Sequence, residues 1–296
     1  MKSSALVKLI TSMVIFGTIG IAVVKLPMPR GFIAMVRGAV GALSLLAITY
    51  LSRGRLSFRA IWRNLPYLLF SGAFIGVNWI LLFESYSYTT VSVATLAYYM
   101  APVFTMLISA VALGERLRVV SLISIAVALV GMLLVSGVLS GGLGGDALAG
   151  ILLALGAALF YAMATVLNKK MRDIPSRDTS IVQLTAAFLT ILPYTLIAED
   201  VSAIEPTPQS IVLLLVVGIL HTGVAYSLFF SSVKELPGQT VAIFSYVDPV
   251  VSVLLSITLL GEKPTPSLII GAALIIGALI FAELPLQPRR ASKGKD

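Results

Sequence analysis

The chain has 296 residues, of which 58% are hydrophobic and only 11% are charged, with a mean hydropathy of +1.01. Soluble domains are about one quarter charged, so this composition excludes a water-soluble fold and predicts an integral membrane protein. The lack of cysteine excludes disulfides and thiolate metal sites, and the single histidine, His221, excludes a site built on several histidines. In a membrane protein, the net charge of +8 reports orientation rather than nucleic-acid binding.

Ten apolar runs follow one another along the chain. Each is close to the roughly 20 residues that a helix needs to cross a hydrocarbon core about 30 Å thick. The runs cover residues 7–24, 32–51, 65–83, 91–112, 119–138, 148–167, 180–198, 210–231, 239–260 and 267–283. The first run lacks a small-x-small cleavage site, which predicts a retained span rather than a removed signal peptide.

Basic residues are divided unevenly between the two sides that ten spans create. One side consists of the N-terminus, the loops after spans two, four, six and eight, and the C-terminus, and it carries 17 Lys and Arg. The five loops on the other side carry 3. Because positive residues are retained in the cytoplasm, both termini are predicted to be cytoplasmic.

One segment occurs twice, at an offset of 147 residues. Residues 91–116 read VSVATLAYYMAPVFTMLISAVALGER, and residues 238–263 read GQTVAIFSYVDPVVSVLLSITLLGEK. Both contain Tyr-x-x-Pro and then Gly-Glu with a basic residue, and the Glu comes 13 positions after the Pro. Internal repeats of this kind report a duplicated unit.

Since five is an odd number, the second five spans must enter the membrane from the opposite face. The predicted fold is therefore an all-α membrane protein of ten helices, built as two inverted five-helix repeats. The predicted divisions are a first repeat at 1–138, a Gly-rich external connector at 139–147, a second repeat at 148–285 and a basic cytoplasmic tail at 286–296.

These features together resemble the EamA-type members of the drug/metabolite transporter superfamily. The resemblance rests on the duplicated unit, the mid-helix Pro, the closing Gly-Glu with its basic residue and the aromatic segment before them. It implies a transporter that exports amino acids or related metabolites, although relatives of the family move nucleotide sugars and phosphorylated sugars. One departure is Asp248, which precedes the second Pro where the first half has Ala101.

Polar residues on the fourth and ninth runs recur at helical spacing. They are Thr95, Tyr98, Pro102, Thr105 and Ser109, and then Ser245, Pro249, Ser252 and Ser256. This spacing places each set on one helical face, which should turn toward protein or water. The two interpretations are helix–helix hydrogen bonds and the lining of a cavity, and recurrence in both halves favours the cavity.

Asp248 is predicted to lie near the middle of its span, where a charged carboxylate costs roughly 2.5–3.5 kcal/mol on insertion scales. It could meet a cationic group of a substrate, exchange a proton, or be a protonated structural residue bonded to Ser245 or Ser252. His221 in span eight could relay a proton or pack as a neutral side chain. Asn78 in span three is a further polar candidate, with an interhelical hydrogen bond as the alternative.

Other residues complete the predicted site. Substrate-binding candidates are Asn78, Trp79, Tyr98, Tyr99, His221, Tyr226, Ser245, Tyr246 and Asp248, with Pro102 and Pro249 as hinges. Glu115 and Glu262 are predicted to be structural, each clamping the end of its own half. Arg37 and Glu84 could pair as a gate, but snorkelling to the interface is the favoured interpretation. Trp62, Tyr67, Tyr86 and Tyr88 are predicted to lie in the interfacial aromatic belts.

The predicted function is a secondary transporter in the inner (plasma) membrane that moves a small neutral or zwitterionic metabolite by alternating access. No phosphate-binding Gly-Lys-Ser/Thr loop and no His-Glu-x-x-His or Gly-x-Ser-x-Gly motif occurs, so neither an ATP-driven pump nor an enzyme is predicted. The alternatives are an intramembrane enzyme and a non-transporting receptor. The expected partners are the solute and the lipid bilayer, with no cofactor, metal or nucleic acid. A proton is one candidate coupling ion, and the chain is expected to be a monomer or a homodimer.

Overall fold

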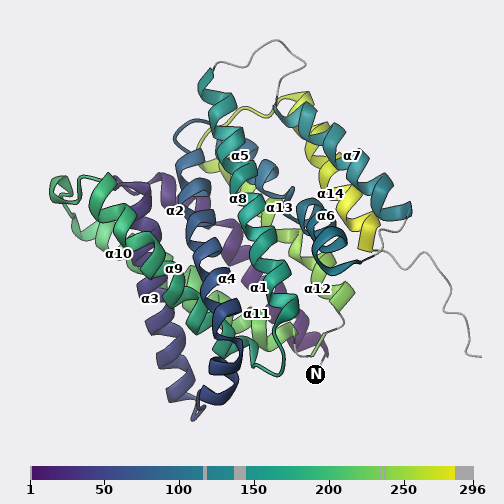
Figure 1. The fold of residues 1–296 in the computed structure, drawn as a ribbon. Coiled ribbons are helices and arrows are strands. Elements are labelled where there is room, and N and C mark those ends of the chain that lie inside the picture. The colour runs from purple at the N-terminus through teal and green to yellow at the C-terminus, as the bar shows by residue number, and fades with distance from the viewer. Residues whose placement is uncertain (1, 116–118, 137–144, 234, 237, 284–296) are drawn as a thin grey trace, which may run out of the picture.

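The computed structural model describes residues 2–115, 119–136, 145–233, 235–236 and 238–283, and every regular element within them is a helix (Figure 1). Most of the predicted connector and all of the predicted tail lie outside these residues. The first half contains α1 (Lys2–Gly17), α2 (Ile19–Val24), α3 (Arg30–Leu51), α4 (Phe58–Ser85), α5 (Val91–Tyr98), α6 (Ala101–Leu113) and α7 (Val119–Ser136).

The second half begins with two long helices and continues with several short ones. It contains α8 (Gly145–Lys170), α9 (Ser176–Ala198), the 3-10 turn η2 (Val201–Ala203), α10 (Pro208–Gly218), the π-helical turn η3 (Ile219–Val224), α11 (Ala225–Val233), α12 (Gly238–Ser245), α13 (Val247–Leu259) and α14 (Pro266–Glu283). Among the described residues, seven helical segments are long and apolar enough to cross a bilayer, and α7, α13 and most of α14 are shorter apolar helices. The chain is therefore a multi-pass membrane protein.

Two of the predicted spans are broken in the middle at a proline. A proline ring clashes with the carbonyl four residues earlier, and the residues four before Pro102 and Pro249 are Tyr98 and Ser245. These two residues are the last of α5 and α12. Each proline consequently lies in the first turn of the next helix, where its missing N–H leaves no hydrogen bond unmade.

Apolar side chains form two separate cores. The first joins α2, α3, α4, α9 and α10 around Ile33, Phe83 and Ile191. The second joins α5, α6, α7 and α14 around Leu96 and Ile275. Helix α8 contributes buried residues to both cores, and Tyr86, which follows α4, packs against both.

Carboxylates of the second half cap helices of the first half. Asp178 accepts a hydrogen bond from Ser57 N at 2.8 Å at the start of α4. Glu199 accepts from Gly31 N at 2.6 Å at the start of α3. The first N–H groups of a helix have no partner within the helix, and a carboxylate there also interacts favourably with the helix dipole.

Helices α7 and α14 lie side by side at one edge of the bundle (Figure 1). Glycine permits their close approach, because a Cβ added at Gly271 would lie 2.6 Å from Gly131 O and 2.7 Å from a methyl of Val135. A Cβ added at Gly277, in the same helix, would meet nothing within 4 Å. The pair therefore packs backbone against backbone at Gly271, as small residues allow in membranes.

We expect Gly271→Ala to lower the stability of the protein, because the added methyl overpacks the α7–α14 contact at a cost of about 1–3 kcal/mol. Gly277→Ala is the matched control and should leave stability unchanged or raise it, since alanine favours helix by up to about 1 kcal/mol over glycine. The melting temperatures of both variants in one detergent measure the difference. Equal melting temperatures would contradict the close packing at Gly271.

Candidate functional site

A cavity of about 380 Å³ lies between the two cores and is lined by helices of both halves. Seven of the nine predicted substrate-binding residues line it: Trp79, Tyr98, Tyr99, Tyr226, Ser245, Tyr246 and Asp248. The predicted hinge residue Pro102 also reaches its wall, whereas Pro249 does not. A concave site of this size, mostly apolar with a few polar groups, is typical of small-molecule binding.

Aromatic rings form much of the cavity wall. Tyr98 contacts Tyr161 with ring centroids 5.8 Å apart and Tyr99 with centroids 6.2 Å apart, and Tyr99 continues the series to Tyr246 at 6.4 Å. Tyr86, which we predicted to lie in an interfacial belt, instead lines the cavity and stacks near Phe83. The wall therefore offers ring faces and edges to an apolar group.

Arg37 is buried inside the protein, which corrects the snorkelling interpretation. The residue is 6% exposed, and its guanidinium carbon is 4.0 Å from the centroid of the Trp79 ring and 5.6 Å from that of Phe83. Its Nε donates to Thr222 Oγ1 at 3.1 Å. Among the described residues it forms no ion pair with Glu84, so the predicted gate between them is not formed.

The surroundings of Arg37 offset much of the cost of its burial. A charge at the centre of a membrane helix costs roughly 2.5–3.5 kcal/mol on insertion scales. A desolvated cation–π contact contributes about 2 kcal/mol, and one hydrogen bond about 1 kcal/mol. The N–H groups of the two terminal nitrogens have no partner within the described part of the chain, and the side chain lines the cavity.

Asp248 is the second residue of α13 and also lines the cavity. The break before α13 places its carboxylate in the first turn of a helix, where unpaired N–H groups and the helix dipole stabilise a negative charge. The Tyr99 hydroxyl lies beside the carboxylate. No ion pair within 4.0 Å joins Asp248 to Arg37 in the described structure, so the cavity is lined by one acidic and one basic side chain that are not paired with each other.

His221 and Asn78 are buried outside the cavity lining. His221 Nε2 lies 2.7 Å from Thr18 Oγ1, at the break between α1 and α2, and its Nδ1 lies 3.2 Å from Val216 O. Asn78 donates to Ala157 O at 2.6 Å and thereby links α4 to α8. These contacts favour the packing interpretation for His221 and the interhelical hydrogen bond for Asn78.

The π-helical turn η3 positions Thr222 against Arg37. In this turn Thr222 Oγ1 donates to Val217 O, five residues earlier, at 3.1 Å. Helix α3 packs so closely on the turn that a Cβ at Gly41 would collide with Thr222 and one at Gly223 with Ser44. Nothing in the residue pattern predicts η3, although π turns inside α-helices occur frequently at functional sites.

The polar face of α5 contacts the polar face of α13. Some of the polar residues predicted on these faces line the cavity, and others only bond the two helices together. Thr95 and Ser252 lie 3.1 Å apart and also line the cavity. Ser92 and Ser256 form a hydrogen bond further along the same contact, where both are buried. The helix–helix interpretation therefore holds toward the helix ends, and the cavity interpretation holds at the centre.

Glu262 caps a helix of the other half and not its own, contrary to the clamp that we predicted. Its carboxylate accepts from Val91 N at 2.7 Å and Ser92 N at 3.2 Å, at the start of α5. The equivalent residue, Glu115, instead accepts from Lys169 Nζ at 2.9 Å. That ion pair is partly exposed, and such pairs contribute at most about 1 kcal/mol.

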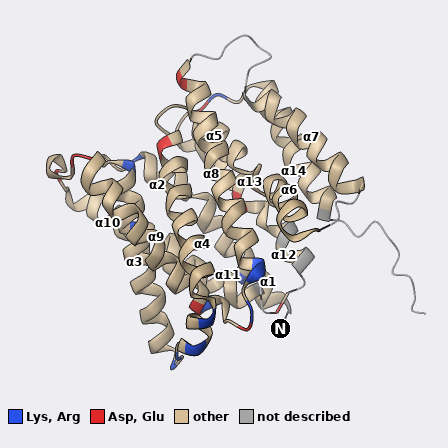
Figure 2. Ribbon diagram, in the orientation of Figure 1, with Lys and Arg blue, Asp and Glu red and all other residues tan. Residues whose placement is uncertain are grey.

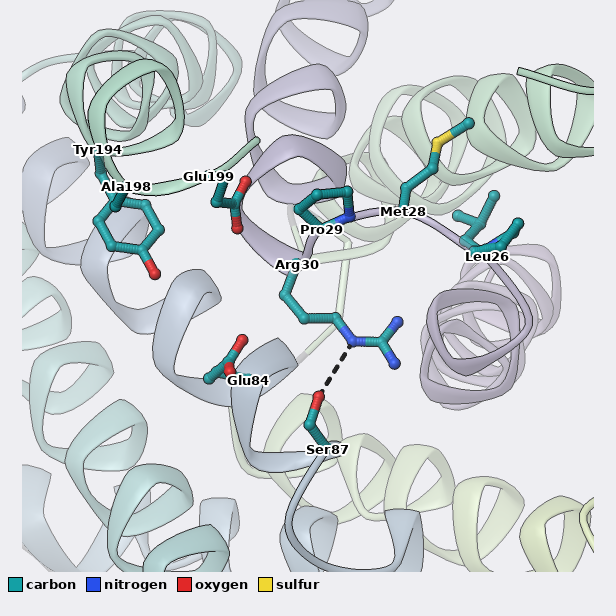
Figure 3. A pocket seen from close by; sticks show the side chains of 10 residues that line it. Leu26, Met28, Pro29, Arg30, Glu84, Ser87, Tyr194, Ala198 and Glu199 are labelled. Carbon is teal, nitrogen blue, oxygen red and sulfur yellow. Dashed lines mark hydrogen bonds between the residues drawn. The ribbon is translucent and has the colours of Figure 1, made fainter. Parts of the chain in front are cut away.

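A second pocket, of about 500 Å³, lies at the end of the bundle where α3 begins (Figure 3). Arg30 donates to Val23 O at 2.7 Å and to Ser87 Oγ at 3.4 Å, the latter drawn as the dashed line in Figure 3. Burial raises the pKa of Glu199, although its hydrogen bonds from Gly31 N and Phe32 N act in the opposite direction. The polar groups here hold helix ends together, so the central cavity is the better candidate site.

Most charged residues of the described chain lie near the two ends of the helix bundle. Lys and Arg are concentrated where α3 ends and α4 begins (Figure 2). A cavity with polar groups, enclosed by apolar helices, defines the class of membrane transport proteins. The sequence profile of the EamA-like transporter family matches residues 3–137 and again residues 148–283. The chain therefore belongs to the EamA-like transporter family and is a membrane transporter.

Similar proteins agree with this assignment. A Bacillus subtilis protein named uncharacterized transporter YxxF is 30% identical over 282 residues, which cover 94% of this chain and 89% of that one. A Salmonella typhimurium protein named probable amino-acid metabolite efflux pump is 28% identical over 201 residues, 64% of this chain and 66% of its own. A crystal structure that is 23% identical covers 95% of this chain and 97% of its own with a TM-score of 0.67, which supports the fold alone.

We expect Glu262→Gln to loosen the contact between α5 and α13, because a glutamine side chain has one acceptor oxygen where the carboxylate has two. Loss of a helix cap costs about 1 kcal/mol, or roughly a fivefold change in an equilibrium. A cysteine introduced by Ser245→Cys would be the only thiol in the chain and would line the cavity. Its labelling by a water-soluble maleimide should become about fivefold faster in the Glu262→Gln background.

Glu205→Gln, at an exposed position in a loop, is the matched control for this measurement. It should leave the labelling rate of the Ser245→Cys protein unchanged. A Glu262→Gln protein that is labelled no faster than the control would show that the cap does not limit access to the cavity.

Proposed function

We propose that this protein is a secondary transporter that moves a small neutral or zwitterionic metabolite, an amino acid or a related compound, out of the cell by alternating access. The observation that carries the proposal is the cavity between the two cores, which is lined by residues of both repeats. A site between inverted halves can be opened to either side when the halves exchange conformations.

The proposed topology has ten spans in two inverted repeats, at 1–138 and 148–285, with both termini in the cytoplasm. Each of the ten apolar runs overlaps a helix or an interrupted helix. The concentration of Lys and Arg at the end of the bundle near the N-terminus supports this orientation (Figure 2). The two transporters named above come from bacteria, and the proposed location of this protein is likewise the inner (plasma) membrane.

Alternating access is proposed to use the helix breaks before Pro102 and Pro249 as hinges. In this proposal, Glu262 holds the cavity closed at the end where α5 begins, because it ties that helix to the second half. Glu115 and Lys169 lie at the opposite helix ends, where their exposed ion pair is more easily broken.

The proposed substrate class follows from the charge of the cavity. A phosphorylated sugar or a nucleotide sugar would need several basic groups, and Arg37 is the one Lys or Arg that lines the cavity within the described residues. The name of the Salmonella typhimurium relative supports an amino-acid metabolite. An intramembrane enzyme has less support, because His221 is bonded to Thr18 and not to Asp248.

The test is counterflow of radiolabelled amino acids in liposomes that contain the purified protein. Substrate that accumulates inside preloaded vesicles supports transport, and binding without movement would support the receptor alternative and contradict the proposal.

In the same assay we expect Asp248→Asn to reduce exchange at least about tenfold, because a hydrogen bond to a charged group is worth roughly 1.5–3 kcal/mol. Proton coupling further predicts that a pH gradient drives accumulation by the wild type and not by this variant. Asp173→Asn is the matched control, because the Asp173 side chain is 83% exposed. Unchanged exchange and pH dependence in Asp248→Asn would remove this carboxylate from the site.

A further inference from the structure

Arg37 has donors that the protein does not use. A guanidinium carries five N–H groups, and within the described residues only Nε has an acceptor, Thr222 Oγ1. The residue is 6% exposed and lines the cavity. A buried cation in a membrane protein is expected to be paired with a carboxylate or with carbonyl groups. The other four N–H groups have no acceptor within the described residues, and the side chain lines the cavity, so these donors are available to a molecule bound there.

We infer that Arg37 binds the carboxylate of the transported solute, while Asp248 binds its ammonium group. This inference rests on the proposed function and narrows its substrate class from neutral or zwitterionic solutes to zwitterions. Arg37 is then a specificity-determining residue that discriminates against amines and amides.

The packing around Arg37 holds the guanidinium in a fixed plane. The guanidinium carbon lies 4.0 Å from the centroid of the Trp79 ring, and Nε donates to Thr222 Oγ1 at 3.1 Å. A planar guanidinium binds a carboxylate through two parallel hydrogen bonds, and pre-orientation reduces the entropy lost on binding. The two terminal nitrogens provide donors for such a bidentate contact.

Asp248, the acidic side chain of the cavity, fits the ammonium end of a zwitterion. Asp248 comes from α13 and Arg37 from α3, and the two are not paired with each other in the described structure. A solute with both an anionic and a cationic group can satisfy both at once. The rings of Tyr98, Tyr99 and Tyr246 supply apolar surface for the rest of the molecule.

The alternative is that Arg37 only fixes helix packing between α3, α4 and η3. In that case its removal would weaken every solute equally and would lower stability. Selectivity separates the two readings, because only a carboxylate-binding residue changes the preference for a carboxylate over an amide.

The probes are L-alanine, L-leucine and L-phenylalanine, each compared with its amide, which lacks the carboxylate, and its N-acetyl derivative, which lacks the ammonium group. Competition with counterflow in proteoliposomes, and protection against thermal unfolding, measure binding. The wild type should prefer at least one free amino acid over both of its derivatives by about tenfold or more.

In Arg37→Gln the preference for the free acid over the amide should fall to less than about twofold, while the preference over the N-acetyl derivative remains. Arg37→Lys should keep part of the preference, because it retains the charge but loses the planar fork. Arg59→Gln, at an exposed position, is the control and should behave as the wild type.

Should Arg37→Gln fail to fold, Thr222→Val tests the same contact, because it removes the hydroxyl that orients the guanidinium. It should lower the acid-to-amide preference several-fold. A wild type that exchanges an amino acid and its amide equally, or an Arg37→Gln or Thr222→Val protein that keeps the full preference, would overturn the role of Arg37 and leave transport intact. A wild type that exchanges neither these three amino acids nor any other radiolabelled amino acid in the counterflow assay would overturn the proposed function as well.

Discussion

The structure depends on how polar groups are satisfied where water is scarce. The first N–H groups of a helix need acceptors, and in this protein carboxylates of the second half supply them to helices of the first half. Asp178, Glu199 and Glu262 cap α4, α3 and α5 respectively. The same contacts that complete the hydrogen bonding of single helices thus hold the halves together and set the shape of the space between them.

Repeated sequence does not produce repeated chemistry here. At the offset of 147 residues, Arg37 corresponds to the buried Leu184, and Asp248 corresponds to Ala101. Each half therefore contributes one charge that the other half lacks. The duplicated frame provides the cavity, and the two departures from the repeat give it polarity.

Much of this arrangement could be predicted from the sequence, because membrane helices and repeats depend on patterns that residue types reveal directly. The family and most of the cavity residues on spans four and nine were predicted in this way, whereas on span three only Trp79 was. Arg37 was missed because a charge near a predicted span end normally lies at the interface, although it shares a face with Ile33 and Gly41 at intervals of four residues. The π turn was missed because its hydrogen bonds depend on tertiary packing and not on residue type.

Helix α8 belongs to both apolar cores, and its contributions to them are only one turn apart. Ala157 packs in the first core and Ala154 in the second, and both are fully buried. Displacement of one core relative to the other would therefore change the packing on this helix. An alanine side chain has no rotamers to exchange. Helices that pack on the alanine surface of α8 can therefore slide along it with little rearrangement of side chains.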